Sequence, residues 1–187
     1  MNLEEIVQAV EFLPTYMPED DIKCLYKYAN LVKDGLIVDV GTGWGKSMLV
    51  LALSNKKNQV ITCDPGDYPI AMNWAKDIEE YTQKIEKIIM DFDLKSNIQF
   101  FPDRAEDFTD RLVEGADMIH FDNWPEISGV DTTDLLKEYI DQLLYGGYFL
   151  ARNYGRGDRQ AYTDSVDKAT EDLRKIETIG LITVFQK

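Results

Sequence analysis

Residues 36–47, LIVDVGTGWGKS, constrain the fold more than any other part of the chain. The apolar run indicates a buried strand, and the residues from Lys46 onward begin a helix. The glycines between them let the backbone turn sharply and come within contact distance of a ligand. The free N–H groups of the first helical turn would then face the polar end of that ligand. The stretch therefore predicts a strand, a ligand-binding loop and a helix.

Three nucleotide-type templates compete for this loop. The dinucleotide template G-x-G-x-x-G needs its third glycine at position 46, where the chain has Lys46. The P-loop template G-x-x-x-x-G-K-[ST] fits Gly45, Lys46 and Ser47 but needs a glycine in place of Val40. The pattern acidic-apolar-G-x-G-x-G is met at every position of residues 39–45. We prefer this third pattern, and the P-loop remains its main rival.

The rest of the chain alternates short apolar runs with longer amphipathic stretches, which is typical of βαβ units. Expected strands cover 36–40, 59–63, 98–101, 117–121 and 148–152, and 175–179 and 181–186 could pair as a hairpin. Expected helices cover 3–13, 19–32, 46–54, 70–90, 106–113, 132–144 and 162–173. We predict one α/β domain over 1–187, a helical lead-in at 1–34 followed by a Rossmann-like core at 35–187. The core is a three-layer sandwich around a mostly parallel seven-stranded sheet with a C-terminal antiparallel hairpin.

Polar residues follow several of the predicted strands. Asp64 ends the second strand, 64 − 45 = 19 residues after Gly45, where a carboxylate can accept hydrogen bonds from both hydroxyls of a ribose. A turn-initiating aspartate before Pro65 and Gly66 is the competing interpretation. The segment PDRAE follows the third strand and Asp122 follows the fourth. All these positions lie at carboxyl ends of strands, the edge at which open α/β sheets bind ligands.

In order and spacing, residues 36–154 resemble the class I S-adenosylmethionine-dependent methyltransferases. The stretches DVGTGWG, FPDRAEDF, ADMIHFDNW and LLYGGYFLARNY are similar to successive motifs of that family. The resemblance implies S-adenosylmethionine as the cofactor and a small molecule as the methyl acceptor. It also implies a cofactor-binding set made of Asp39, Gly41, Thr42, Gly43, Trp44, Gly45, Asp64, Asp103, Arg104 and Asp122.

The same resemblance implies a role for each of these residues. The loop glycines would border the methionine part of the cofactor, with Asp39 supporting the loop. Asp64 would bind the ribose, and Asp103 and Arg104 would lie near the adenine. Asp122 would lie near the methionine amino group or the acceptor.

Small O-methyltransferases of this family hold a divalent ion with an acidic residue after strand four and an Asp-Asn pair after strand five. Here Asp122 and Asn153 are present, but Arg152 stands beside Asn153. The positive charge of a guanidinium repels a metal ion at such a site, so we expect no metal. His120 is the only histidine, and we interpret it as a packed strand residue. No catalytic residue is identified, because methyl transfer from a sulfonium needs mainly alignment and a dry pocket.

Composition narrows the class of partner. Asp and Glu number 34 against 20 Lys and Arg, and this net charge of -14 disfavours nucleic acid and anionic membranes. The two cysteines do not make a disulfide framework, and the N-terminus lacks the features of a signal peptide, so we expect a cytoplasmic protein. The helical lead-in could close the pocket or form a homodimer contact, and Trp124 and Glu126 could overhang the pocket. A P-loop nucleotide hydrolase and a non-catalytic S-adenosylmethionine-binding protein remain the alternatives.

Overall fold

The computed structural model describes residues 1–112, 115–122 and 131–187. Within them, a seven-stranded sheet has the order β3-β2-β1-β4-β5-β7-β6. Neighbours among β1 to β5 pair in parallel, whereas β7 runs antiparallel to β5 and β6. The strands are β1 Leu36–Val40, β2 Gln59–Cys63, β3 Ile98–Phe101, β4 Ala116–Phe121, β5 Leu143–Arg152, β6 Arg174–Ile179 and β7 Ile182–Gln186. The predicted mostly parallel sheet with a C-terminal antiparallel hairpin is confirmed.

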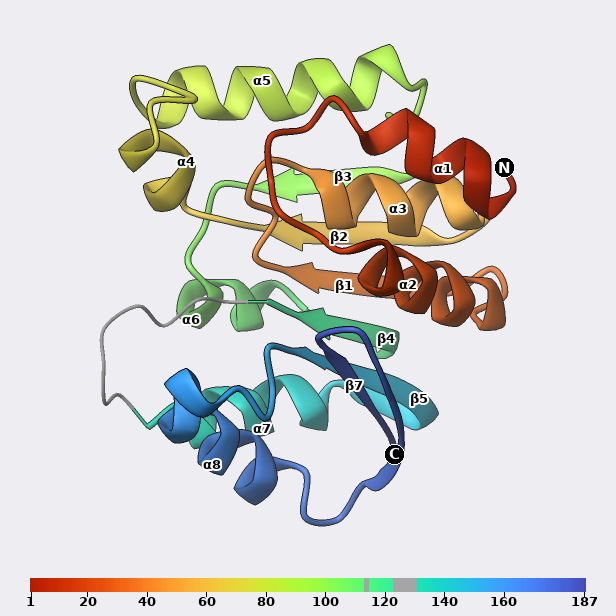
Figure 1. Ribbon diagram of the computed structural model, residues 1–187, viewed down its shortest axis with the longest axis vertical. Coiled ribbons are helices and arrows are strands. Elements are labelled where there is room, and N and C mark those ends of the chain that lie inside the picture. The colour runs from red at the N-terminus through yellow and green to blue at the C-terminus, as the bar shows by residue number, and fades with distance from the viewer. Residues whose placement is uncertain (113–114, 123–130) are drawn as a thin grey trace.

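Helices cover both faces of the sheet, which gives the predicted three layers. Figure 1 shows α1 and α2 grouped with α3, and α7 and α8 lying together beside β5. The helices are α1 Leu3–Val10, α2 Glu19–Leu31, α3 Lys46–Ser54, α4 Asp67–Ala71, α5 Ile78–Asp91, α6 Ala105–Phe108, α7 Thr133–Asp141 and α8 Gln160–Ala169, with 3-10 turns η1 Thr109–Arg111 and η2 Gly157–Arg159. Among the described residues, no helix is long and apolar enough to cross a membrane.

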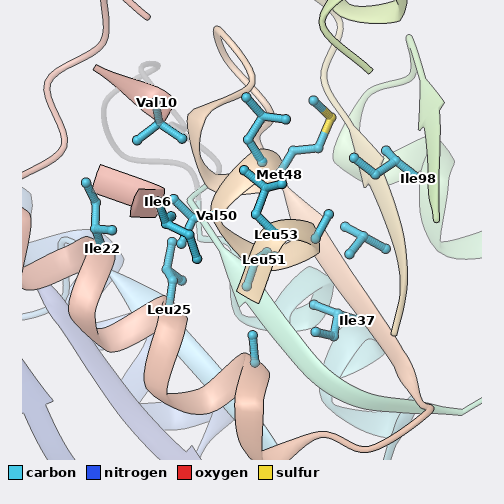
Figure 2. Packing of buried hydrophobic residues seen from close by; sticks show 14 of the residues in the cluster. Ile6, Val10, Ile22, Leu25, Ile37, Met48, Val50, Leu51, Leu53 and Ile98 are labelled. Carbon is cyan, nitrogen blue, oxygen red and sulfur yellow. The ribbon is translucent and has the colours of Figure 1, made fainter. Parts of the chain in front are cut away.

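Helix α3 is enclosed between the lead-in helices and the sheet. All nine of its residues are buried, as expected for a short helix that is apolar nearly all round. Figure 2 shows Ile6 of α1 and Leu25 of α2 next to Val50 of α3, with Ile37 of β1 on the other side of the helix. Each fully buried aliphatic side chain contributes about 1.5–3 kcal/mol. Because Lys46 begins α3, this two-sided packing fixes the position of the glycine loop before it.

The strand order places a crevice at the end of β1. From β1 the chain moves to β2 and β3 on one side of the sheet, and then to β4 and β5 on the other. Connections that leave in opposite directions open a space outside the carboxyl ends of the strands, and ligands of open α/β sheets bind there. The glycine loop lies at this switch point.

One predicted helix is wrong. Residues 70–90 form two helices, because α4 ends at Ala71 and α5 begins at Ile78. Between them Asn73 takes a left-handed backbone conformation with φ 57°. Asp77 then caps α5 by accepting a hydrogen bond of 2.9 Å from the backbone N–H of Glu80. The apolar spacing continues across this break, so periodicity alone did not reveal it.

The predicted start of the fifth strand is also wrong. Strand β5 begins at Leu143, and α7 before it ends at Asp141. Gly146 and Gly147, which precede the predicted strand at 148–152, lie inside β5, beside a register shift in its pairing with β4. A Cβ on Gly147 would lie 2.9 Å from the carbonyl oxygen of Asp117, so this glycine permits close contact with β4. The last helix, α8, is shorter than the predicted helix at 162–173. The predicted helix at 106–113 corresponds to α6 and η1, and its residue 113 lies outside the described residues.

Candidate cofactor-binding site

The glycine loop has a backbone that only glycine adopts at low cost. Gly41, Gly43 and Gly45 have φ angles of 95°, 52° and 89°, in the left-handed region. Gly45 also caps α3, and a Cβ there would lie 3.2 Å from Cε of Met48. A Cβ on Gly43 would meet nothing within 4 Å, so the loop is open on the side of Gly43.

The loop is tied to the neighbouring strand and faces a cavity. The backbone N–H groups of Gly41 and Thr42 donate to the carbonyl of Cys63 over 3.0 and 3.2 Å. The side-chain oxygens of Thr42 and Thr62 are 2.5 Å apart. Gly41, Thr42, Gly43 and Trp44 line the cavity, which has a volume of about 700 Å³ and falls in the range of small-molecule sites. Gly45 is not among its lining residues.

Asp39 lies beneath the loop and does not line the cavity. Its carboxylate is fully buried and accepts hydrogen bonds from the hydroxyls of Ser47 at 2.9 Å and Thr62 at 3.1 Å. Its other oxygen is 2.7 Å from Nδ1 of His120. Through these contacts, Asp39 joins β1 to β2, to β4 and to the first turn of α3. Asp39 therefore supports the loop, and His120 is the packed strand residue that the sequence predicts.

Asp64 lies at the end of β2 and lines the cavity. One carboxylate oxygen accepts a hydrogen bond of 2.9 Å from the N–H of Gly43, and the other accepts one of 2.6 Å from the N–H of Gly66. Burial raises the pKa of Asp64, while the two N–H groups and the Tyr81 hydroxyl act in the opposite direction. The bond to Gly66 is the predicted turn, and the bond to Gly43 ties the carboxylate to the loop. The turn interpretation of Asp64 is thus confirmed, and ribose binding stays a prediction.

Asp122 and Arg152 form a partly buried ion pair at the ends of β4 and β5. Nη1 of Arg152 lies 2.6 Å from Oδ2 of Asp122, and Nδ2 of Asn153 donates to Oδ1 over 3.1 Å. Nε of Arg152 binds Asp21 of α2 at 2.9 Å, and Nη2 donates to the carbonyl of Tyr16 at 3.0 Å. Burial raises the pKa of Asp122, and the Arg152 charge opposes that rise. The guanidinium therefore points into the site instead of turning away from it.

The two predicted adenine-side residues separate in the structure. Arg104 lines the cavity and pairs with Asp67 at 2.7 Å. Asp103 is not a lining residue, and its carboxylate lies 2.5 Å from Nε of Arg111. Neighbouring residues of an extended chain point in opposite directions, which accounts for the separation. Trp124 and Glu126 lie outside the described residues.

The lead-in forms part of the cavity wall, which is one of the two roles expected for it, but the residues that do so were not predicted. Residues 14–17, the lead-in segment between α1 and α2, all line the cavity. Two cationic side chains hold this segment. Nζ of Lys46 donates to the carbonyl of Thr15 at 3.1 Å, and Nη2 of Arg152 donates to the carbonyl of Tyr16. Burial lowers the pKa of Lys46. Pro14 and Pro18 mark the segment as a loop, but no residue type in it signals a ligand.

The described residues contain no group of three His, Cys, Asp or Glu side chains arranged to hold a metal ion. At the strand ends the position next to Asp122 is filled by Arg152. The site thus combines a glycine loop, one carboxylate bound to that loop and a second carboxylate bound by a guanidinium.

The fold is that of the class I S-adenosylmethionine-dependent methyltransferases. An O-methyltransferase from Bacillus cereus in complex with SAH has a TM-score of 0.68 at 15% identity, covering 99% of this chain and 90% of that chain. The O-methyltransferase TomG from Streptomyces achromogenes, in complex with SAM, has a TM-score of 0.64 at 17% identity, with 98% and 88% covered. A methyltransferase from Geobacter sulfurreducens has a TM-score of 0.63 at 13% identity, with 99% and 87% covered.

No protein-family model matches the sequence, and no curated protein sequence matches it. At the identities of the solved structures, the similarity establishes the fold.

Proposed function

We propose that the chain is an S-adenosylmethionine-dependent methyltransferase that acts on a small-molecule acceptor. The observation that carries this proposal is the cavity at the switch point, lined by Gly41, Gly43, Asp64 and Asp122 from three adjacent strand ends. Solved neighbours of the same fold contain SAM or SAH, which supports the choice of cofactor. When bound, S-adenosylmethionine supplies an electrophilic methyl group, and the protein aligns the acceptor with it and excludes water.

Within this proposal, Asp64 binds the ribose hydroxyls. An ionised carboxylate has about four lone-pair sites, and two are used by the N–H groups of Gly43 and Gly66. The two backbone bonds fix the orientation of the carboxylate, which keeps acceptor capacity for ribose hydroxyls. Gly41, Thr42, Gly43 and Trp44 border the cofactor, whereas Asp39 and Gly45 support the loop from behind.

At the adenine end we propose that Arg104 contacts the cofactor and that Asp103 orients Arg111. Asp122 lies at the methionine or acceptor end, where its carboxylate is held by Arg152 and Asn153.

We also propose that the reaction is independent of a divalent metal. The support is the guanidinium of Arg152, which lies between the carboxylates of Asp122 and Asp21 and forms an ion pair with each of them. A divalent ion bound by Asp122 would lie beside this cation and be repelled. Turnover should therefore be unchanged by EDTA, and a loss of turnover on chelation, restored by Mg²⁺, would contradict metal independence.

Titration calorimetry tests the function directly. The wild-type chain should bind S-adenosylmethionine and S-adenosylhomocysteine (SAH), and Asp64→Asn should weaken SAH binding by tenfold or more, since a hydrogen bond to a charged group contributes about 1.5–3 kcal/mol. Asp110→Asn is the matched control, because Asp110 is an exposed aspartate on η1 and is not a lining residue. A folded wild-type chain that binds neither compound would refute the proposal.

The structure adds no support for a P-loop hydrolase. Lys46, which would contact phosphates in that mechanism, donates to the carbonyl of Thr15. Asp122, which would serve as the acidic strand residue, is paired with Arg152. ATP hydrolysis that disappears in Lys46→Ala would restore this alternative. Tight SAH binding without methylation of any compound in a broad panel would favour a non-catalytic binding protein.

A further inference from the structure

Among the described residues that line the cavity, one positive charge has no carboxylate partner. Four cationic side chains line it, those of Lys46, Arg104, Arg152 and Arg156. Each of the three arginines pairs with a carboxylate at 2.9 Å or less. Lys46 forms no ion pair with any described residue, and the charge of Glu11 acts on it only from a longer range. An anion in the cavity would therefore find its uncompensated positive charge at Lys46.

The burial of Lys46 makes the missing counter-charge costly. The residue is 8% exposed, and lysine is almost never buried to this degree without a charged partner. Burial lowers its pKa, which is the effect of taking an ammonium group out of water. Nζ donates to the carbonyl of Thr15, but a carbonyl does not neutralise a full charge. An ammonium has three donors, so two N–H groups of Lys46 remain for a ligand.

The backbone beside Lys46 also favours an anion. The N–H of Leu49 donates to the carbonyl of Gly45, whereas the N–H groups of Lys46, Ser47 and Met48 have no acceptor among the described residues. The first turn of α3 contains no acidic residue, so the positive end of the helix is not offset there. The ammonium and the helix end thus place positive charge at the same point of the cavity wall.

The strand order indicates which anion reaches this point. Strand β1 lies between β2 and β4, and Lys46 follows the glycine loop at the end of β1. A cofactor that extends from Asp64 on β2 to Asp122 on β4 crosses this loop. Its methionine part carries an ammonium group, which suits the carboxylate of Asp122, and a carboxylate group, which suits Lys46.

We propose that Lys46 binds the carboxylate of the cofactor's methionine part and so selects a carboxylated cofactor over one that lacks this group. Hydrogen bonds between an ammonium and a carboxylate are about twice as strong as those between neutral groups. Because Lys46 also binds Thr15, the same side chain joins the cofactor to the wall segment 14–17. The inference rests on the methyltransferase function proposed above.

Two ligands that differ only in the carboxyl group test the inference. S-adenosyl-3-thiopropylamine is SAH without its carboxyl group, and it keeps the amine, the ribose and the adenine. Titration calorimetry at neutral pH should show that wild-type protein binds SAH about tenfold or more tightly than this amine. Equal affinities would overturn the inference and leave the cofactor assignment intact.

Substitutions assign the preference to the lysine. Lys46→Met should weaken SAH by about tenfold and leave the affinity for the amine within about twofold of wild type. Lys46→Gln removes the charge but keeps a side-chain donor for the carbonyl of Thr15, and it should give the same result. Lys57→Met is the matched control with the same change of charge, because Lys57 is exposed and is not a lining residue. It should change neither affinity by more than about twofold.

A purely structural role of Lys46 predicts a different pattern. If both variants weaken SAH and the amine equally, Lys46 acts only through the wall segment and the inference is wrong. It is equally wrong if both variants bind the two ligands as Lys57→Met does.

The acceptor is the other source from which a carboxylate could come. Benzoate provides a probe: its binding to SAH-saturated protein should be the same in wild type and Lys46→Met. Benzoate binding that disappears in Lys46→Met, with SAH affinity unchanged, would assign the lysine to the acceptor and overturn the inference. If folded wild-type protein binds no SAH, the methyltransferase proposal fails and this inference fails with it.

Discussion

At the scale of single residues, the buried carboxylate of Asp39 connects the loop to the sheet. It accepts hydrogen bonds from Ser47 and Thr62 and lies 2.7 Å from His120, and all four side chains are buried. The position of the loop therefore depends on a side chain that no ligand needs to touch. Truncating such a residue leaves several buried polar groups without a partner.

The variant Asp39→Ala should lower the free energy of unfolding by about 3 kcal/mol, because each unsatisfied buried donor costs about 1–3 kcal/mol. Urea denaturation followed by circular dichroism measures this change. The control Asp110→Ala, at an exposed position, should stay within about 0.5 kcal/mol of wild type. Equal midpoints for the two variants would show that Asp39 does not hold the loop.

The raised pKa of Asp64 predicts a pH dependence of cofactor binding. Burial sets this pKa above 3.8, and the ribose hydroxyls need the ionised carboxylate as acceptor. SAH affinity should therefore fall as the pH drops through the raised pKa, at a pH above 3.8. Stability has the opposite sign: the folded state favours the protonated form, so the contribution of Asp64 to stability decreases as pH rises from 3.8 through the raised pKa.

Calorimetric titrations with SAH between neutral pH and pH 4 measure the effect. In the plot of SAH affinity against pH, Asp64→Asn should remove the decrease that is due to protonation of Asp64. Any decrease due to Asp122, whose pKa is also raised by burial, should remain. Identical pH profiles for wild type and Asp64→Asn would contradict the ribose assignment.

At the scale of elements, the tip of the C-terminal hairpin contacts the start of α2. Gly180, between β6 and β7, has φ 61°, and a Cβ there would lie 2.3 Å from Oδ1 of Asp21. That same oxygen accepts a hydrogen bond of 2.7 Å from the N–H of Leu181. The contact joins the hairpin to the lead-in at the cavity wall, which Leu181 lines.

Gly180→Ala should lower the free energy of unfolding by about 1–3 kcal/mol, because it adds left-handed strain and a clash with Asp21. Gly157→Ala is the matched control, since a Cβ on Gly157 meets nothing within 4 Å. Thermal unfolding of both variants measures the difference. A Gly180→Ala variant as stable as Gly157→Ala would show that the hairpin tip adjusts freely.

The sequence predicts those elements whose signal is local. The strand bounds of β1 and β2, and the helix bounds of α3, agree with prediction because apolar runs, glycines and polar strand ends coincide there. The break before α5 was missed because it depends on the φ of Asn73 and the cap at Asp77. A role of the lead-in at the pocket was expected, but residues 14–17 were not singled out because Lys46 and Arg152 bind backbone carbonyls, which every residue type supplies.

At the scale of the whole molecule, we propose that the lead-in and the core unfold as one unit. Helix α3 is buried between α1 and α2 on one side and β1 on the other. Removing the lead-in would expose an apolar face of α3 to water, a cost that grows with the apolar area exposed. The predicted homodimer contact of the lead-in stays a prediction.

The two free cysteines report on this cooperativity. Cys24 lies in α2 and Cys63 in β2, and both are buried. Burial raises the pKa of Cys24 to about 12, so the folded thiol should react slowly with disulfide reagents. In the single-thiol variants Cys63→Ser and Cys24→Ser, labelling during urea unfolding should show the same midpoint for both thiols. Earlier labelling of Cys24 would mean that the lead-in opens before the core.

The carboxylate of Asp21 has a further consequence for synthesis on the ribosome. It is fully buried, yet its partners are Arg152 and the N–H of Leu181, which follow it by 131 and 160 residues. An unpaired carboxylate resists burial, so α2 cannot settle completely while the nascent chain is short. The cavity wall should close only after residue 181 has emerged, and cofactor binding should therefore follow that step.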